Sequence, residues 1–487
     1  MNASAVISQF RAICAIPHPS GHLDALRQYI VDVLSSNGYC AEVDAVGNIR
    51  ADIPASDGWE EKADVPSSDK EQITTIQSHY DMVPQANLDS SHNFLTDPLL
   101  LRHVGNRLMA TDTTLGADNG VGVAAMLAIA CDKTLVHGPL ELLFTVDEEV
   151  GMKGVREMRQ NWLKGSVLLN LDTEQEGELM VGCAGAVDIA ASYRYKLEKG
   201  IPDGDVAVLL SLKGLKGGHS GMDIQLGRGN ACKLMARFLK HIVVNYEARL
   251  SWFNGGGVRN AIPREASAVV TIPSEVLDEL MDEVRYYADL YRYELRGVDD
   301  GVILTAVETN DPETLLPEEV QDDILNSIEA AHDGVLRYSP DVPGVVETSS
   351  NLATVEMQHS DESGECRVCI MVRSMNEEMK RALASRLQSA FILGGARVDF
   401  SAAYPGWELP VGSPLLKRMR DCYRELFGTD VRVNSVHCGL ECGIIHEQYP
   451  GMQIISFGPT IHHPHSPEES VELDSIDRFW QYLCAVI

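Results

Sequence analysis

The sequence predicts an α/β protein with a mixed, largely parallel sheet, interrupted by a large α+β insertion. Two observations predict this architecture. Helical and strand-like segments alternate through residues 1–185, and the same alternation returns over residues 404–487. Between them, at 186–403, long alternating strands and amphipathic helices replace that pattern. Because alternating strands and helices favour a parallel sheet, we expect one domain in two parts, 1–185 and 404–487, around an inserted domain at 186–403.

The first part carries both periodicities clearly. A helical repeat of apolar residues predicts helices at about 3–16, 22–36 and 119–130. Short apolar runs rich in β-branched residues predict strands at 73–77, 140–146 and 167–171. In sheets of this kind, ligand sites collect at the carboxyl ends of the strands. We therefore expect the chemistry to lie just after these three strands.

The inserted segment shows a similar order of elements twice. Strands at 187–196 and 206–213 precede helices at 229–246 and 274–291, which enclose two strands. Helices near 314–332 and 376–392 then enclose strands near 350–358 and 365–373, before a strand at 396–401. This order predicts a duplicated α+β sandwich made of two successive units. After residue 404 we expect a helix at 413–427, a strand at 431–436 and a final helix from about 472.

Composition excludes several classes of protein. A formal net charge of -31 excludes a nucleic-acid partner, because phosphate binding requires a basic surface. The longest apolar run, 121–131, is too short to cross a membrane. The eleven cysteines are scattered, and Cys366 and Cys369 lie in a predicted strand without a second pair to complete a zinc site. With no signal peptide in the N-terminal residues, we expect a cytoplasmic protein.

Acids and histidines follow the three predicted strands. His79 and Asp81 follow the first, Glu148 and Glu149 the second, and Asp172 the third. Imidazole and carboxylate groups are the ligands of catalytic zinc, which also needs an open position and a nearby base. A surplus of acids beyond the ligand set therefore favours a catalytic metal site over a storage site.

Two further candidates have competing interpretations. Asp118 stands between glycines at the start of a predicted helix, and taken alone it is best interpreted as a helix N-cap. The alternative is a carboxylate that bridges two metal ions. His465 has neighbours at His462 and His463, and spacing does not choose among the three.

Taken together, these motifs resemble a known family. The segments that carry the resemblance are SHYDMV (78–83), LGADNGVG (115–122), TVDEEVGMKG (145–154), NLDTE (170–174), GGHSG (217–221), HCGLECG (437–443) and GPTIHHPHSPEE (458–469). Their order and spacing are similar to those of the dinuclear zinc peptidases, which include aminoacylases, glutamate carboxypeptidases and aminoacyl-histidine dipeptidases. The resemblance is closest to the last group. It implies a zinc-peptidase-like catalytic domain whose insertion is a lid, also used for dimerisation.

The resemblance also implies roles for individual residues. The implied metal ligands are His79, Asp118, Glu149, Asp172 and His465, with Asp118 bridging. Glu148 would be the general base and Asp81 would orient His79. His219 would reach the active site from the lid, often across a dimer, and stabilise the oxyanion. Asn260, Arg373 and Glu441 would contact substrate.

The implied activity is hydrolysis of unblocked dipeptides with broad specificity, including Xaa-His substrates such as β-Ala-His. Two Zn²⁺ per subunit are implied, although Mn²⁺ and Co²⁺ suit the same ligands. The implied assembly is a homodimer. Two other hypotheses are an N-acyl-amino-acid deacylase of the same superfamily and a non-catalytic metal-binding scaffold.

Overall fold

The computed structural model describes residues 3–60, 71–410 and 412–487, and it divides into two compact units. The first comprises the described residues of Met1–Cys183, Trp407–Ser435 and Leu440–Ile487. The second comprises Ala184–Gly406 and Val436–Gly439. The boundaries expected after residues 185 and 403 lie close to those at 183 and 406. The sequence did not predict that residues 436–439 would belong to the second unit.

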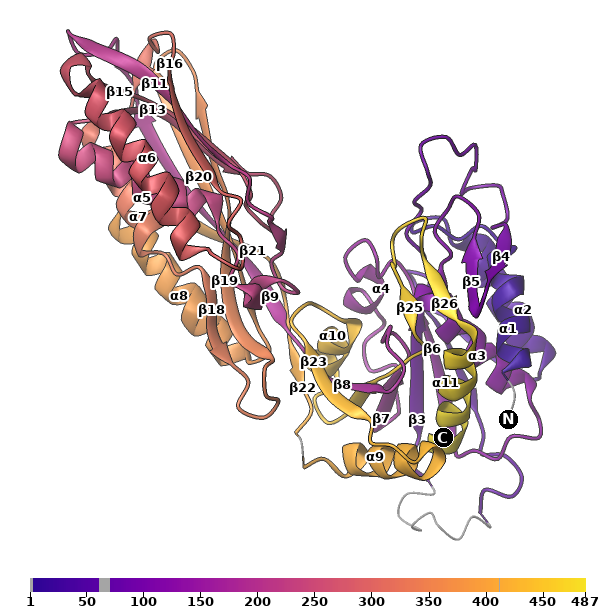
Figure 1. Cartoon of the computed structure of the whole chain (residues 1–487). Helices are drawn as coiled ribbons and strands as arrows, with labels where there is room; N and C mark the ends of the chain where they lie inside the picture. The colour runs from indigo at the N-terminus through magenta and orange to yellow at the C-terminus, as the bar shows by residue number, and fades with distance from the viewer. Residues whose placement is uncertain (1–2, 61–70, 411) are drawn as a thin grey trace. The chain divides into compact units, whose positions relative to one another are not determined.

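A mixed sheet forms the centre of the first unit (Figure 1). Its strand order is β1 (Ala41–Val43), β2 (Ile49–Ile53), β6 (Leu140–Thr145), β3 (Thr74–His79), β7 (Val167–Asn170), β24 (Gln453–Ser456), β8 (Glu178–Cys183) and β22 (Trp407–Glu408), and β23 (Arg432–Val436) also pairs with β8. The pairs that join β6, β3, β7 and β24 are parallel. The pairs outside them are antiparallel. The predicted mixed α/β sheet is confirmed, with its parallel part at the centre.

Five helices of this unit lie close to the predicted positions. They are α1 (Ser4–Cys14), α2 (Asp24–Ser36), α3 (Ala117–Cys131), α9 (Pro414–Phe427) and α11 (Leu473–Val486). Two short helices, α4 (Lys153–Arg156) and α10 (Glu441–Gln448), were not predicted. Helix α3 is apolar all round and is buried between β3 and α1. Gly122 allows this close packing, because a Cβ there would lie 2.3 Å from the Ser78 hydroxyl oxygen on β3. The N-terminus of α3 is thereby held near the end of β3.

A small second sheet connects two distant segments of the first unit. Its order is β25 (Ile461–His462), β26 (Ser470–Glu472), β5 (Arg107–Ala110) and β4 (Leu101–Val104). Strand β26 pairs with β5, placing Ser470 opposite Met109. The turn at 463–469 therefore lies beside the chain that leads from β5 into α3.

The second unit is one long antiparallel sheet with helices on one face (Figure 1). Its main strand order is β16 (Ile303–Glu308), β11 (Asp205–Lys213), β15 (Ala266–Pro273), β13 (Arg249–Gly256), β19 (Val346–His359), β20 (Ser363–Ser374), β9 (Gly185–Lys196) and β21 (Arg397–Tyr404), with β18 (Gly334–Tyr338) beside β19. The helices are α5 (Ala231–Tyr246), α6 (Leu277–Glu294), α7 (Glu318–Ala330) and α8 (Glu377–Leu393). An apolar core fills the space between helices and sheet.

The topology of this unit contains a repeat. Strands and helices β11, α5, β13, β15, α6 and β16 follow one another as strand, helix, strand, strand, helix, strand. The same order describes β9, α7, β19, β20, α8 and β21, and the two halves have matching strand orders. The halves meet where β13 pairs with β19, at Gly255 opposite Val355. The sequence predicted successive units, but the first half is inserted between β9 and α7 of the second.

Two short two-stranded sheets also belong to this unit. They are β10 (Glu198–Lys199) with β17 (Thr314–Leu315), and β12 (Gly218–His219) with β14 (Ala261–Ile262). Cys366 and Cys369 both lie in β20, as predicted, and none of the eleven cysteines, all within the described residues, is assigned to a disulfide bond. Across the described residues, we find no helix with the length and apolar character that a membrane crossing requires.

Candidate active site

The acids and histidines predicted from the sequence gather at one edge of the first sheet. His79 is the last residue of β3, and Asp172 lies two residues after the end of β7. Glu148 and Glu149 follow β6, which ends at Thr145. The three strands are parallel and in register, so their carboxyl ends lie together. The fold therefore brings these side chains into one place.

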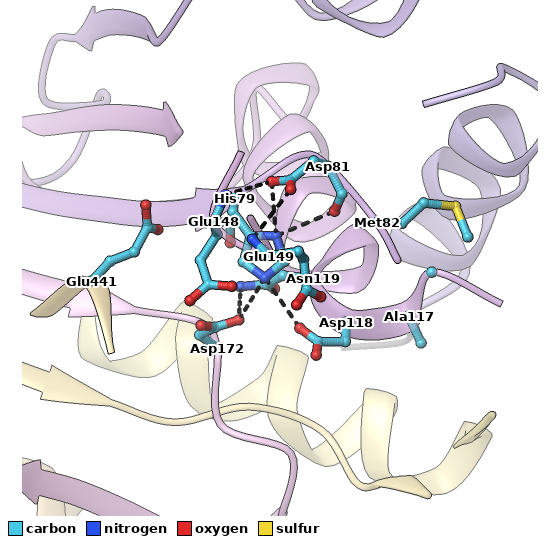
Figure 2. Close-up of polar contacts among 12 residues, drawn as sticks. His79, Asp81, Met82, Ala117, Asp118, Asn119, Glu148, Glu149, Asp172 and Glu441 are labelled. Carbon is cyan, nitrogen blue, oxygen red and sulfur yellow. Dashed lines mark hydrogen bonds and ion pairs between the residues drawn. The ribbon is translucent and has the colours of Figure 1, made fainter. Parts of the chain in front are cut away.

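Asp118 lies between the two histidines. Its Oδ1 is 3.1 Å from His79 Nε2, and its Oδ2 is 3.2 Å from His465 Nε2. His79 Nε2 also lies 3.1 Å from Asp172 Oδ1, and His465 Nε2 lies 2.9 Å from Glu149 Oε1. Figure 2 shows the side chains of His79, Asp118 and Asp172 converging. Two of the three candidate ligand groups among the described residues share Asp118, and the third combines His79, Glu148 and Glu149.

The spacing of these atoms suits a metal ion. Two ligand atoms bound at the usual zinc distances in a tetrahedral arrangement lie about 3.3 Å apart. The nitrogen–oxygen distances in both sets run from 2.9 to 3.2 Å. Side chains with nitrogen and oxygen donors at this separation fit zinc, and they also fit manganese or cobalt. The described residues therefore contain a candidate metal site.

The interpretation of Asp118 as a helix N-cap is wrong. The N-cap position of α3 is Gly116, and no side chain from within the helix start accepts its N–H groups. Gly116 adopts a left-handed conformation with φ of 67°, which glycine tolerates without strain. The Asp118 carboxylate instead faces the imidazoles, as the alternative interpretation required.

The structure also chooses among the three neighbouring histidines. His465 lies in the turn between β25 and β26, which the small sheet holds beside the start of α3. His462 is directed elsewhere, because its Nε2 lies 2.7 Å from Glu472. Among the described residues, His465 is the only member of this cluster that belongs to a set of candidate metal ligands.

Asp81 connects His79 to the loop that carries Glu148 and Glu149. His79 Nδ1 lies 3.2 Å from the Asp81 carbonyl oxygen and 3.4 Å from its carboxylate. The same carboxylate accepts the backbone N–H groups of Glu148 at 3.1 Å and Glu149 at 3.3 Å, and the Ser20 hydroxyl at 2.7 Å. Asp81 thus orients the imidazole, as a partner of a metal ligand does, and it also positions the loop after β6.

Three acids of the cluster have raised pKa values, which indicates that the site needs positive charge to compensate them. Burial raises the pKa of Glu148 well above its usual value, and the charges of Asp172, Glu149 and Glu441 raise it further. Burial also raises the pKa of both Glu149 and Asp172. Carboxyl groups this close do not all ionise unless cations compensate them. A site of this composition is therefore suited to divalent metal ions.

Two polar residues that support the ligands were missed by the sequence analysis. The Asn119 side-chain N–H donates to Asp172 Oδ1 at 2.6 Å, holding that carboxylate against the start of α3. The Glu469 carboxylate accepts the backbone N–H groups at the start of α3. Both lie inside quoted motifs, next to Asp118 and Glu468, but no local pattern separates such partners from ordinary polar residues.

Glu441 does not occupy the position that was expected for it. The side chain was expected to contact substrate, yet it is fully buried. Its Oε2 accepts the Gln77 amide at 2.6 Å and the Thr145 hydroxyl at 2.7 Å. Burial raises the pKa of Glu441 to about 8. Through these contacts Glu441 connects β3 to β6, and no part of its surface is accessible to a substrate.

The second unit brings the remaining candidates together around His219. His219 lies in β12, opposite Ala261, and Asn260 adjoins this pair. The backbone N–H groups of Gly221 and Met222 both donate to His219 Nδ1, at 3.2 and 3.0 Å. Burial and the charge of Arg373 lower the pKa of His219. A neutral imidazole whose Nδ1 accepts hydrogen bonds carries its hydrogen on Nε2, where it can donate.

Arg373 lies beside this histidine as a buried cation. Only 3% of it is exposed, and its Nε and Nη1 donate to the Ser220 hydroxyl at 3.3 Å and the Tyr404 hydroxyl at 2.9 Å. Both of these partners are uncharged hydroxyl groups. Burying a guanidinium group beside neutral partners alone is unfavourable. An anionic ligand would compensate that charge.

Comparisons with known proteins bear on this site. The sequence model of peptidase family M20/M25/M40 matches residues 75–487. The cytosol non-specific dipeptidase of Escherichia coli strain K12 is 39% identical over 478 residues, covering 98% of this chain and 96% of that protein. The aminoacylhistidine dipeptidase structure from Vibrio alginolyticus is 40% identical, with a TM-score of 0.90 over 99% of this chain and 96% of that one. A Staphylococcus aureus tripeptidase, 14% identical with a TM-score of 0.60 over 100% and 98% of the two chains, shares the fold.

Proposed function

This chain belongs to peptidase family M20/M25/M40, and from this premise we propose that it is a metal-dependent dipeptidase acting on unblocked dipeptides. The observation that carries the proposal is the pair of ligand sets that share Asp118, with Glu148 beside them. The names of the E. coli and V. alginolyticus relatives support dipeptides, including Xaa-His, as the substrate class.

Each ligand set would hold one metal ion. His79 and Asp172 would complete one set and Glu149 and His465 the other, with one Asp118 oxygen in each. We assign zinc to both, with manganese and cobalt as substitutes, because imidazole and carboxylate ligands suit all three. When bound, such a metal acidifies water and polarises the substrate carbonyl group.

Glu148 is the general base of the proposed reaction. Its carboxylate belongs to a group with His79 and Glu149, and a carboxylate beside a metal site can serve as a general base. It takes the proton from the attacking water and returns it to the nitrogen of the leaving amine. The scissile C–N bond breaks as that nitrogen is protonated, so the products are two free amino acids. Asp81 keeps His79 and the Glu148 backbone in place during these steps.

His219, Asn260 and Arg373 bind the substrate in this proposal. The hydrogen on His219 Nε2 donates to the carbonyl oxygen as negative charge develops on it. Arg373 receives the C-terminal carboxylate, because guanidinium and carboxylate groups form paired hydrogen bonds. Its buried, uncompensated charge supports this role. Asn260, exposed next to β14, supplies an amide for the peptide backbone.

Arg373→Gln is expected to raise KM for free dipeptides roughly 10- to 150-fold, since a hydrogen bond to a charged group contributes about 1.5–3 kcal/mol. Steady-state kinetics on a dipeptide and on its C-terminal amide measure the effect, which should be small for the amide. The matched control is Arg367→Gln, an exposed arginine on the same strand. An equal loss on both substrates would mean that Arg373 does not bind the carboxylate.

One assay separates the proposed function from its two alternatives. Purified protein is incubated with zinc and offered free dipeptides, such as β-Ala-His, and N-acetylated amino acids. Release of amino acids from free dipeptides supports the dipeptidase. Preference for acetylated substrates would support the deacylase, and hydrolysis of neither would leave the metal-binding scaffold.

A homodimer in the cytoplasm completes the proposal. The cytosolic name of the E. coli relative supports that location. For the dimer, size exclusion is combined with mixing of two inactive variants, His219→Ala and Glu148→Gln. Recovered activity on mixing means that His219 acts across the dimer. An active monomer would instead fit the duplicated second unit, which already pairs two equivalent halves inside one chain.

A further inference from the structure

Four consecutive backbone N–H groups at the start of α3 donate to one carboxylate, that of Glu469. Leu115 and Gly116 donate to Oε2 at 2.8 and 3.0 Å, and Ala117 and Asp118 donate to Oε1 at 2.7 and 3.3 Å. These groups have no partner inside the helix. The two oxygens of one buried side chain therefore hold the turn that carries the Asp118 carboxylate.

Glu469 belongs to the same short segment as His465. Its backbone N–H donates to the Ser466 carbonyl at 3.0 Å, closing a tight turn after the histidine. The next residue, Ser470, enters β26 and pairs with Met109 on β5. Glu469 is thus fixed on one side to the His465 turn and on the other to the Asp118 turn.

This position links two candidate ligands of one metal ion. Asp118 Oδ2 and His465 Nε2 are 3.2 Å apart, and they come from segments separated by more than three hundred residues. Residues that orient metal ligands typically change metal affinity 10- to 100-fold when they are replaced. His79, by contrast, ends β3, and Asp172 lies two residues after β7, so the central sheet positions both without Glu469.

We infer that Glu469 is a positioning residue that holds Asp118 and His465 at the spacing needed to bind one of the two metal ions. Its role goes beyond capping a helix, because the same carboxylate sets the distance between two ligand-bearing segments. The inference rests on the two-metal site of the proposed function. It does not depend on the substrate, because metal binding by itself tests it.

The test is a competition titration of the metal-loaded protein with a zinc chelator, with metal content measured by elemental analysis. Glu469→Gln keeps the shape but turns an NH₂ group toward two N–H donors. Because Asp118 offers an oxygen to both ligand sets but His465 belongs to only one of them, we expect the ion at His465 to be bound about 10- to 100-fold more weakly. The ion at His79 should lose less affinity. Cobalt-loaded protein should lose one component of its visible absorption spectrum in parallel.

Two controls isolate the effect. Glu468→Gln changes the exposed neighbour of Glu469, and Ser413→Ala removes the cap of α9, whose side chain accepts the Leu416 N–H. Neither should change metal affinity, although the second should lower the melting temperature. If Glu469→Gln does not fold, Glu469→Asp is titrated, because it keeps the charge but shortens the reach.

The possible outcomes are distinct. A larger loss of affinity for the ion at His465 than for the ion at His79 supports the inference. Unchanged affinity for both ions with a lower melting temperature would reduce Glu469 to a helix cap, and equal weakening of both would also overturn the inference. If wild-type protein binds two ions per chain but cleaves no dipeptide, the proposed function fails while the role of Glu469 is still decided by the titration.

Discussion

Replacing Glu148 with glutamine is expected to lower kcat by about 10²- to 10⁴-fold, the usual contribution of a general base. Glutamine has nearly the same volume but cannot accept the proton of the attacking water. The backbone N–H of residue 148 would still donate to Asp81, so the loop should keep its position. Steady-state kinetics on a free dipeptide, with elemental analysis of the same sample, measure both expectations.

The matched control is Glu157→Gln, an exposed glutamate of the same segment. It should leave turnover and metal content unchanged. Metal loss in Glu148→Gln would make Glu148 a ligand instead of a base. Wild-type turnover with both metals bound would assign proton transfer to another group.

Asp118→Ala is expected to weaken binding of both metal ions by more than about 100-fold, because even residues that only orient ligands contribute 10- to 100-fold. The reason is geometric: each Asp118 oxygen faces a different histidine. Asp172→Ala, by contrast, should weaken only the ion at His79. Chelator titration with elemental analysis distinguishes the two results.

Asp89→Ala, which changes an exposed aspartate with no described bond, controls for nonspecific metal uptake. Retention of one ion at wild-type affinity in Asp118→Ala would show that Asp118 is not shared. Circular dichroism of each variant checks that the fold is intact, so that metal loss is attributed to the missing ligand and not to unfolding.

Local sequence patterns predicted the regular elements well. The start and end of α5 and β3 differ by only a few residues from the expected ranges. Helix α5 carries a helical repeat of buried residues, and β3 is a short run with β-branched residues that is buried throughout. Strand β24, with four residues, was missed although it lies inside the main sheet. A run that short carries too little pattern to distinguish it from a loop. The family resemblance, which rested on motif order, is confirmed.

The order of the inserted domain was predicted only in part. Two similar series of elements were recognised, but they were taken as successive. Strand β9 in fact pairs with β20 and β21, so it belongs to the later half. The pairing of strands that are distant in sequence is determined by the burial of a common core. A local sequence pattern does not indicate which strands will pair.

The sequence by itself determined the chemistry of this protein: which acids and histidines follow the strands, and therefore which metal ions suit them. The tertiary structure decided three further points. It directs the Asp118 carboxylate toward both His79 and His465, places His465 beside Glu149, and buries Glu441 in the interior. Each depends on segments hundreds of residues apart that meet through strand pairing and close packing, such as β26 against β5. The spacing of residues along the chain does not show which distant segments will make such contacts.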